Sequence, residues 1–226
     1  MEINQLNLNR SLFQITTGKK HRVCGNGFMI FTEPGKGLAF TPFSSRIAPN
    51  GRDTNLYSRA RFENGFSSRL VYRADNPGIN FSLAELDARG IEKMAAPVHL
   101  SFKLPAEGAQ ITCVQPNGSF PTEFRKSIET SSEPNQFMFG AMAPADYIGG
   151  AVVHEDKVIG LVTRPFYASP SAEIIGMTGG TSIRTIFDFL IRGAQGSVVH
   201  PDGFKYNLDP KITAIINQIA EALSAA

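Results

Sequence analysis

Short apolar runs separated by glycine, proline and asparagine fill most of the first 165 residues, and they limit what this chain can fold into. Each run is four to six residues long, and the set is Leu12–Thr16, Phe28–Phe31, Leu38–Thr41, Ser68–Tyr72, Phe81–Leu86, Gln110–Val114, Ala151–His154 and Val158–Thr163. Many short runs at such short spacing are typical of the strands of a β-barrel or β-sandwich. Turn residues between apolar runs also predict two hairpins, which turn at residues 33–37 and 154–157.

Helical periodicity begins only near residue 180. One apolar face repeats at i, i+3, i+4 and i+7 through Ile183, Ile186, Phe187 and Leu190, with Thr181 or Ser182 as the N-cap. A second amphipathic helix is predicted to begin with Asp209 as N-cap and Pro210 in its first turn. Its apolar stripe is Ile212, Ile215, Ile216, Ile219 and Leu223. The pair Gly179–Gly180 is interpreted as a turn rather than a phosphate-binding loop, because no Lys-Ser or Lys-Thr pair follows it.

The composition is that of a folded globular chain, with 42% hydrophobic and 19% charged residues. A net charge of +2 is too small to indicate a polyanionic partner by itself. Cys24 and Cys113 predict two buried thiols in a reducing compartment, with a disulfide between them as the alternative. The chain begins without a signal-peptide pattern and has no apolar run of membrane-spanning length. We therefore expect a soluble protein of the cytoplasm or another reducing compartment, without a cofactor.

Five segments occur in an order known from one superfamily. They are residues 25–30, 37–41, 80–87, 149–161 and 182–193. This series resembles the protease domain of trypsin-like serine proteases, most closely the HtrA/Deg branch. The resemblance implies an all-β fold of two six-stranded antiparallel β-barrels with C-terminal α-helices. It implies one unit over residues 1–203, with barrels over about 10–100 and 101–178 and a closing helix over about 181–193; residues 204–226 then form an amphipathic helix packed on the barrels.

The resemblance also places the catalytic positions of the superfamily on residues of different chemistry. The histidine position falls on Ser44, the aspartate position on Asn80 and the nucleophile position on Ile148, while Asp146 stands where the oxyanion hole has glycine. The mechanism needs a hydroxyl that attacks a carbonyl, an imidazole that takes its proton and a carboxylate that orients the imidazole. Ile148 has no lone pair, and a negative charge at Asp146 opposes a developing oxyanion. We therefore predict a non-catalytic serine-protease homologue and no enzyme activity.

A protease with a relocated active site is one alternative to this prediction. Cys24 or Cys113 would be the nucleophile of such a site and would need a nearby histidine; His21 close to Cys24 is the sequence-local candidate. The histidines are His21, His99, His154 and His200. None has a partner at a metal-ligand spacing, so no metal site is predicted.

Such a scaffold still has a cleft between its barrels and an edge strand that can pair with an extended peptide. The resemblance places this edge at Leu161, Val162, Thr163 and Arg164. The predicted function is therefore that of a protein-binding or scaffold module with a partner of unknown identity. By analogy with the same proteins, self-association is expected through the segment near Leu12 and Phe13.

A second binding hypothesis starts from arginines that alternate with aromatic residues over residues 52–73. The arginines are Arg52, Arg59, Arg61, Arg69 and Arg73, and the aromatic residues are Tyr57, Phe62, Phe66 and Tyr72. This composition is typical of surfaces that bind nucleic acid or an acidic partner. The small net charge favours the other interpretation, in which the aromatic residues belong to the core and the arginines form a solvated face.

Overall fold

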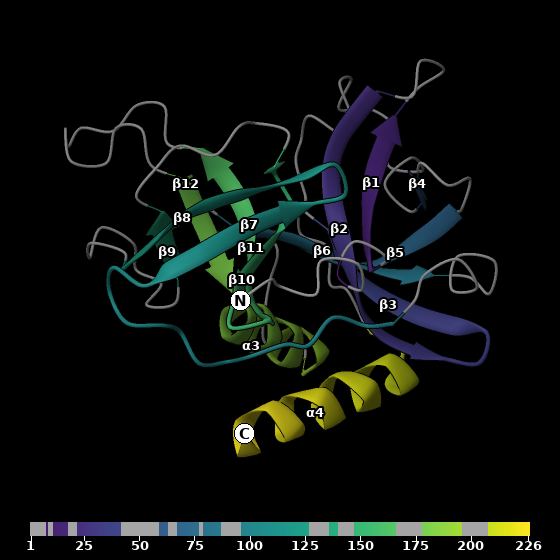
Figure 1. Ribbon diagram of the computed structural model, residues 1–226. Helices are drawn as coiled ribbons and strands as arrows, with labels where there is room; N and C mark the ends of the chain where they lie inside the picture. Colours follow the sequence, from purple (N-terminus) through teal and green to yellow (C-terminus); the bar gives the residue numbers. More distant parts are fainter. Residues whose placement is uncertain are drawn as a thin grey trace.

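Two closed six-stranded barrels stand side by side in the computed structural model (Figure 1). It describes residues 8, 11–17, 22–41, 59–62, 67–76, 79–86, 96–126, 136–139, 147–165, 178–195 and 208–226. The first barrel contains β1 (Leu12–Thr17), β2 (Arg22–Glu33), β3 (Lys36–Thr41), β4 (Arg59–Phe62), β5 (Ser67–Asn76) and β6 (Ile79–Leu86), joined in the order β1-β2-β3-β6-β5-β4. The second contains β7 (Gln110–Gln115), β8 (Gly118–Lys126), β9 (Gln136–Phe139), β10 (Ala151–His154), β11 (Lys157–Pro165) and β12 (Thr178–Ser182), joined in the order β10-β11-β12-β9-β8-β7. The predicted fold class is confirmed.

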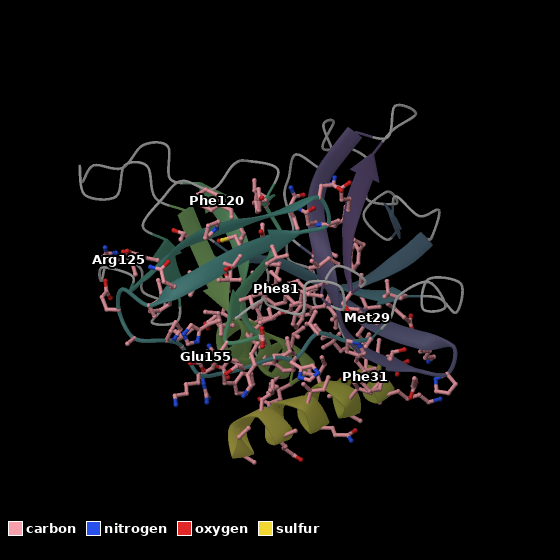
Figure 2. The ribbon with its side chains drawn as sticks, viewed as in Figure 1. Met29, Phe31, Phe81, Phe120, Arg125 and Glu155 are labelled. Atoms are coloured by element: carbon pink, nitrogen blue, oxygen red, sulfur yellow. The ribbon has the colours of Figure 1, made fainter. Side chains whose placement is uncertain are left out.

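Both predicted hairpins form, and their turns use left-handed backbone conformations. Gly35 has φ +82° between β2 and β3. Between β10 and β11, Glu155 and Asp156 have φ of 47° and 62°. Two consecutive positive φ values match the twist of a tight hairpin even without glycine. Glu155 is exposed at the tip of this hairpin (Figure 2).

The interpretation of Gly179–Gly180 as a turn is wrong, because both residues lie inside strand β12. This strand pairs with β11 on one side and β9 on the other, with Gly180 opposite Val162 and Phe137. Both glycines are buried. Without side chains they carry no alternation of apolar and polar residues, so the pattern that reveals a strand was missing here.

Two helices close the structure below the barrels in the view of Figure 1. In α3 (Ile183–Ala194), the N-cap Ser182 accepts a hydrogen bond at Oγ from the Thr185 amide, 3.1 Å away. In α4 (Pro210–Ala225), the Asp209 carboxylate accepts one from the Lys211 amide at 2.8 Å. Both caps agree with the sequence prediction. Neither helix is long and apolar enough to cross a membrane, a finding that covers the described part of the chain.

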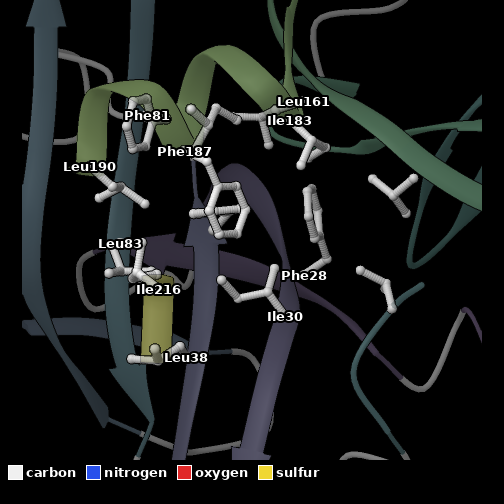
Figure 3. Packing of buried hydrophobic residues seen from close by; sticks show 14 of the residues in the cluster. Phe28, Ile30, Leu38, Phe81, Leu83, Leu161, Ile183, Phe187, Leu190 and Ile216 are labelled. Atoms are coloured by element: carbon white, nitrogen blue, oxygen red, sulfur yellow. The ribbon is translucent and has the colours of Figure 1, made fainter. Parts of the chain in front are cut away.

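A core shared by the first barrel, both helices and part of the second barrel holds these elements together (Figure 3). At its centre, the ring of Phe40 meets the rings of Phe28, Phe81 and Phe187 edge to face, at centroid distances of 5.9, 6.1 and 5.8 Å. All four side chains are fully buried. Each such phenylalanine contributes about 1.5–3 kcal/mol through burial. Ile216 brings α4 into the same cluster.

Candidate functional site

The site is built around residues 147–150, which lead directly into β10. The Gly149 amide donates to the Val162 carbonyl at 2.8 Å, and the Val162 amide donates to the Gly150 carbonyl at 3.0 Å. The Gly150 amide closes a turn onto the Tyr147 carbonyl at 2.8 Å. These bonds fasten the loop to the middle of β11. The loop is therefore attached to the second barrel along β11.

Both glycines of this loop are required by the backbone. Gly149 has φ +80°, a conformation that residues with a side chain rarely adopt. A Cβ at Gly150 would lie 2.6 Å from the Val114 carbonyl oxygen and 2.9 Å from that of Tyr147. The Gly-Gly pair that supported the resemblance thus has a local steric cause.

Tyr147 anchors the loop in the second barrel. Its side chain is 8% exposed and belongs to a cluster inside that barrel. The ring lies 6.0 Å from that of Phe120, the residue marked on β8 in Figure 2. Nothing in the local sequence pattern distinguished this buried tyrosine from an exposed one.

Asn26 on β2 fastens the same loop to the first barrel. Its backbone amide donates to the Ile148 carbonyl at 2.9 Å, and its side-chain Nδ2 donates to the same oxygen at 3.0 Å. Asn26 is fully buried, whereas the Ile148 side chain is half-buried. Sequence reasoning missed this residue. The available signal was a polar residue between two glycines, Gly25 and Gly27, in an apolar strand.

The first half of the predicted cleft edge is occupied by the protein itself. Leu161 is paired with Ala151 on one side and Thr181 on the other. Val162 is paired with Gly180 of β12, and its amide and carbonyl both bond to the loop. Neither residue offers free backbone groups to a peptide.

The second half of that edge continues past the loop. Thr163 is 8% exposed, and its Oγ1 donates to the Gly179 carbonyl at 3.0 Å. Arg164 and Pro165 pair with Gly179 and Thr178 of β12. On the opposite side of Thr163–Pro165, no strand within the described ranges is paired. This three-residue stretch is the open edge of β11.

The positions assigned to a catalytic triad are only partly described. Ser44 and Asp146 lie outside the described residues. Asn80 is the second residue of β6, with its backbone opposite Asp75 of β5. Ile148 is held by its carbonyl, as above, and its hydrocarbon side chain supplies no nucleophile.

Cys113 does not offer a relocated nucleophile. Its side chain is fully buried inside the second barrel, and this desolvation raises the pKa of the thiol from its ordinary value of 9.0 to about 12. The side chain of Cys24, and all of His21, lie outside the described part. Among the described residues, no group of three or more His, Cys, Asp or Glu is arranged to hold a metal ion.

The arginine segment is brought together by strand register rather than by sequence spacing. Arg59 of β4 lies opposite Arg69 of β5, and Arg69 lies opposite Glu85 of β6. Arg61 and Arg73 are opposite Ser67 and Ser82, whereas Arg52, Tyr57 and Phe66 are outside the described residues.

Tyr72 belongs to the core rather than to a binding surface. Its side chain is 1% exposed, its ring stacks on Phe81 at 5.8 Å, and its hydroxyl donates to the Phe189 carbonyl at 3.3 Å. A base cannot stack on a ring in this position. Leu12 and Phe13 are likewise 5% and 4% exposed, so most of their surface is used within the chain.

Comparison with known proteins supports the fold through structure alone. No protein-family model matches the sequence, and no curated protein matches it. A serine endoprotease from Yersinia pestis superposes with a TM-score of 0.57 at 16% identity, over 88% of this chain and 69% of that one. The HtrA-type protease AlgW gives 0.54 at 11% identity, over 85% and 66% of the two chains. Kallikrein-related peptidase 10 gives 0.52 at 14% identity, over 83% and 96%.

These neighbours contradict the prediction that the chain is not an enzyme. They are a serine endoprotease, an HtrA-type protease and a peptidase, and the likeness to them is one of fold. Because Ile148 is a hydrocarbon, any nucleophile that cuts a peptide bond would have to come from another residue. The chain has the two-barrel fold of the trypsin-like serine proteases, HtrA-type proteases among them.

Proposed function

We propose that this chain binds an extended segment of a protein partner by β-strand addition at Thr163–Pro165, the open edge of β11. The observation that carries the proposal is the change in pairing along β11. Val162 is bonded on both sides, whereas Arg164 and Pro165 pair only with β12 among the described strands, and Thr163 lies at the register shift between Val162 and Arg164. An unpaired strand edge offers backbone donors and acceptors to another chain. AlgW, part of which has this fold, was solved with a decapeptide.

The open edge is short, and it lacks one donor. Three residues of strand span about 10 Å, so the edge pairs with about three residues of the partner. Pro165 has no amide hydrogen and accepts hydrogen bonds only through its carbonyl. In sheets, proline is tolerated at an edge position with its nitrogen toward the open side. The partner's carbonyl opposite Pro165 is therefore left without a hydrogen bond from the backbone.

Replacing Pro165 tests this geometry. A decapeptide is first selected from a displayed random library on the wild-type chain, and its Kd is measured by fluorescence anisotropy. Pro165→Ala adds one backbone donor, and one hydrogen bond is worth about 0.5–1.5 kcal/mol, so we expect binding to tighten by roughly two- to twelvefold.

Pro121→Ala is the matched control, because Pro121 is an exposed proline on strand β8 of the same barrel. It should leave the Kd unchanged. Equal affinities for wild type and Pro165→Ala would remove the edge of β11 from the binding site, and a library with no enriched decapeptide would refute the proposed function. Mass spectrometry of the bound decapeptide records in the same experiment whether the chain cleaves it.

An acidic partner or nucleic acid is the second candidate, and the register of β4 and β5 favours it. Arg59 and Arg69 are directly opposite, and like charges in this relation destabilise a strand pair. An anionic partner would add negative charge beside these two positions; Glu85, which is opposite Arg69 in the register, pairs with Lys36 at 3.9 Å. Affinity for single-stranded RNA should then fall steeply with salt concentration. An affinity that does not change with salt would rule this candidate out.

A further inference from the structure

The loop at residues 147–150 is held between the two barrels by contacts of different kinds. On the second barrel, Tyr147 is buried in the cluster around Phe124, and the amides of Gly149 and Val162 tie the loop to β11. On the first barrel, Asn26 donates two hydrogen bonds to the loop. The loop thus connects the two barrels, and Asn26 is its hydrogen-bonding partner on the first barrel among the described residues.

Two donors from Asn26 converge on one acceptor 122 positions away. A carbonyl oxygen has two lone pairs, and the Ile148 oxygen receives the backbone amide at 2.9 Å and Nδ2 at 3.0 Å. The backbone donor is available to any residue other than proline at position 26, whereas the second donor belongs to the carboxamide. Because Asn26 is fully buried, water does not replace that donor when it is removed.

From these contacts we infer that Asn26 is a positioning residue, whose carboxamide sets the conformation of the loop and of the open edge of β11 beside it. The path is continuous: Asn26 holds Ile148, the next residue Gly149 bonds to the Val162 carbonyl, and Val162 precedes the open edge. A shift of the Ile148 carbonyl moves the anchor that ends the paired part of β11. The effect of Asn26 on function rests on the proposed peptide binding, whereas its effect on the conformation of the loop does not.

Asn26→Asp separates positioning from bulk, because the two side chains have nearly the same shape. An ionised carboxylate cannot donate and places its charge about 3 Å from the Ile148 oxygen, whereas the protonated acid regains a donor. Burial raises the pKa of a carboxyl group above its ordinary value of about 3.9, so protonation is expected at mildly acidic pH. The variant should therefore behave as damaged at pH 8 and as nearly wild type at pH 5.

Two readouts are compared with wild type at each pH. With the selected fluorescent decapeptide, Asn26→Asp should bind roughly tenfold more weakly at pH 8, about the cost of one charged buried hydrogen bond, and recover at pH 5. Hydrogen–deuterium exchange at the amides of Gly149 and Val162 should be faster than in wild type at pH 8 only. Asn26→Ala removes the donor without adding charge, so its binding should be weakened at both pH values.

The matched control is Gln14→Glu. Gln14 is a buried amide on β1 directly opposite Asn26, and its replacement by glutamate introduces the same charge as Asn26→Asp. If Gln14→Glu shows the same pH-dependent loss, the effect comes from buried charge and the inference is overturned. It is also overturned if Asn26→Asp and Asn26→Ala bind equally at pH 5, a comparison that holds even if Asn26→Asp unfolds at pH 8. Altered exchange with no decapeptide binding in wild type would support positioning and refute the proposed function.

Discussion

Gly150→Ala should destabilise the chain because its new methyl group meets backbone on two sides. The added Cβ would lie 2.6 Å from the Val114 carbonyl oxygen, about 0.8 Å short of the 3.4 Å at which ordinary contact begins. Val114 cannot retreat freely, since β7 is paired with β10 on one side and β8 on the other. The loop must therefore move, and it does so at the expense of the 3.0 Å bond from the Val162 amide to the Gly150 carbonyl.

The size of the destabilisation by Gly150→Ala follows from the steric overlap and the lost hydrogen bond. Overpacking costs about 1–3 kcal/mol and a lost buried hydrogen bond about 0.5–1.5 kcal/mol, so we expect a decrease of roughly 2–4 kcal/mol in the free energy of unfolding. For a chain of this size, that corresponds to a fall in Tm of about 5–15 °C. Urea titration and thermal unfolding followed by circular dichroism measure both quantities.

Gly118→Ala provides the matched comparison on strand β8. Its Cβ would lie 3.1 Å from the Tyr147 hydroxyl, the end of a side chain rather than backbone, and nothing else lies within 4 Å. We expect this variant to change stability by less than about 1 kcal/mol, because the hydroxyl can shift by a few tenths of an ångström. If Gly150→Ala were no less stable than Gly118→Ala, the close packing of the loop against β7 would be wrong.

Further predictions concern the buried ionisable groups and a helix cap. Burial raises the pKa of Cys113 from 9.0 to about 12 and that of Tyr72 from 10.0 to about 12. As the pH rises, the unfolded chain therefore loses these protons before the folded chain does. The free energy of unfolding should be at its full value below pH 9 and fall between pH 9 and 12, by up to about 1.4 kcal/mol per pH unit and group. Urea midpoints that stay constant from pH 9 to 12 would contradict this prediction, and Cys113→Ala should remove most of the decrease between pH 9 and 10. Asp209→Ala removes the helix cap that accepts a hydrogen bond from the Lys211 amide, and it should lower the free energy of unfolding by about 1 kcal/mol in urea titration. Asp209→Asn keeps a capping oxygen and should lower it little. Equal losses in the two variants would assign the effect to the charge of Asp209 rather than to the cap.

Local sequence was enough to predict those turns and helix ends whose determining residues lie next to them in the chain. The hairpin at Glu155–Asp156 and the caps Ser182 and Asp209 depend on neighbours in sequence, and the structure has them where the pattern indicates. Strand β12 was missed because Gly179–Gly180 has no side chains to alternate. Its identity as a strand comes from two neighbouring strands that are distant in sequence.

The candidate site was only partly predictable for the same reason. The sequence placed the edge of β11 at four residues, but pairing to the loop and to β10 occupies Leu161 and Val162. Tyr72, which the sequence grouped with surface arginines, stacks on Phe81 in the core. Burial of an aromatic residue depends on which elements cover it, and that information is not local.

By itself, the sequence determined a chain of short strands and two late amphipathic helices, and in its order of motifs it carried the two-barrel fold. Periodicity, turn residues and caps are local properties, so they survive without knowledge of the partner strands. Only the tertiary structure decided that Asn26 would meet Ile148 across 122 residues, and that the last three residues of β11 would have no strand on one side among the described residues. Both depend on how two closed barrels meet, because hydrogen bonds between distant segments have no signature in the sequence around either partner.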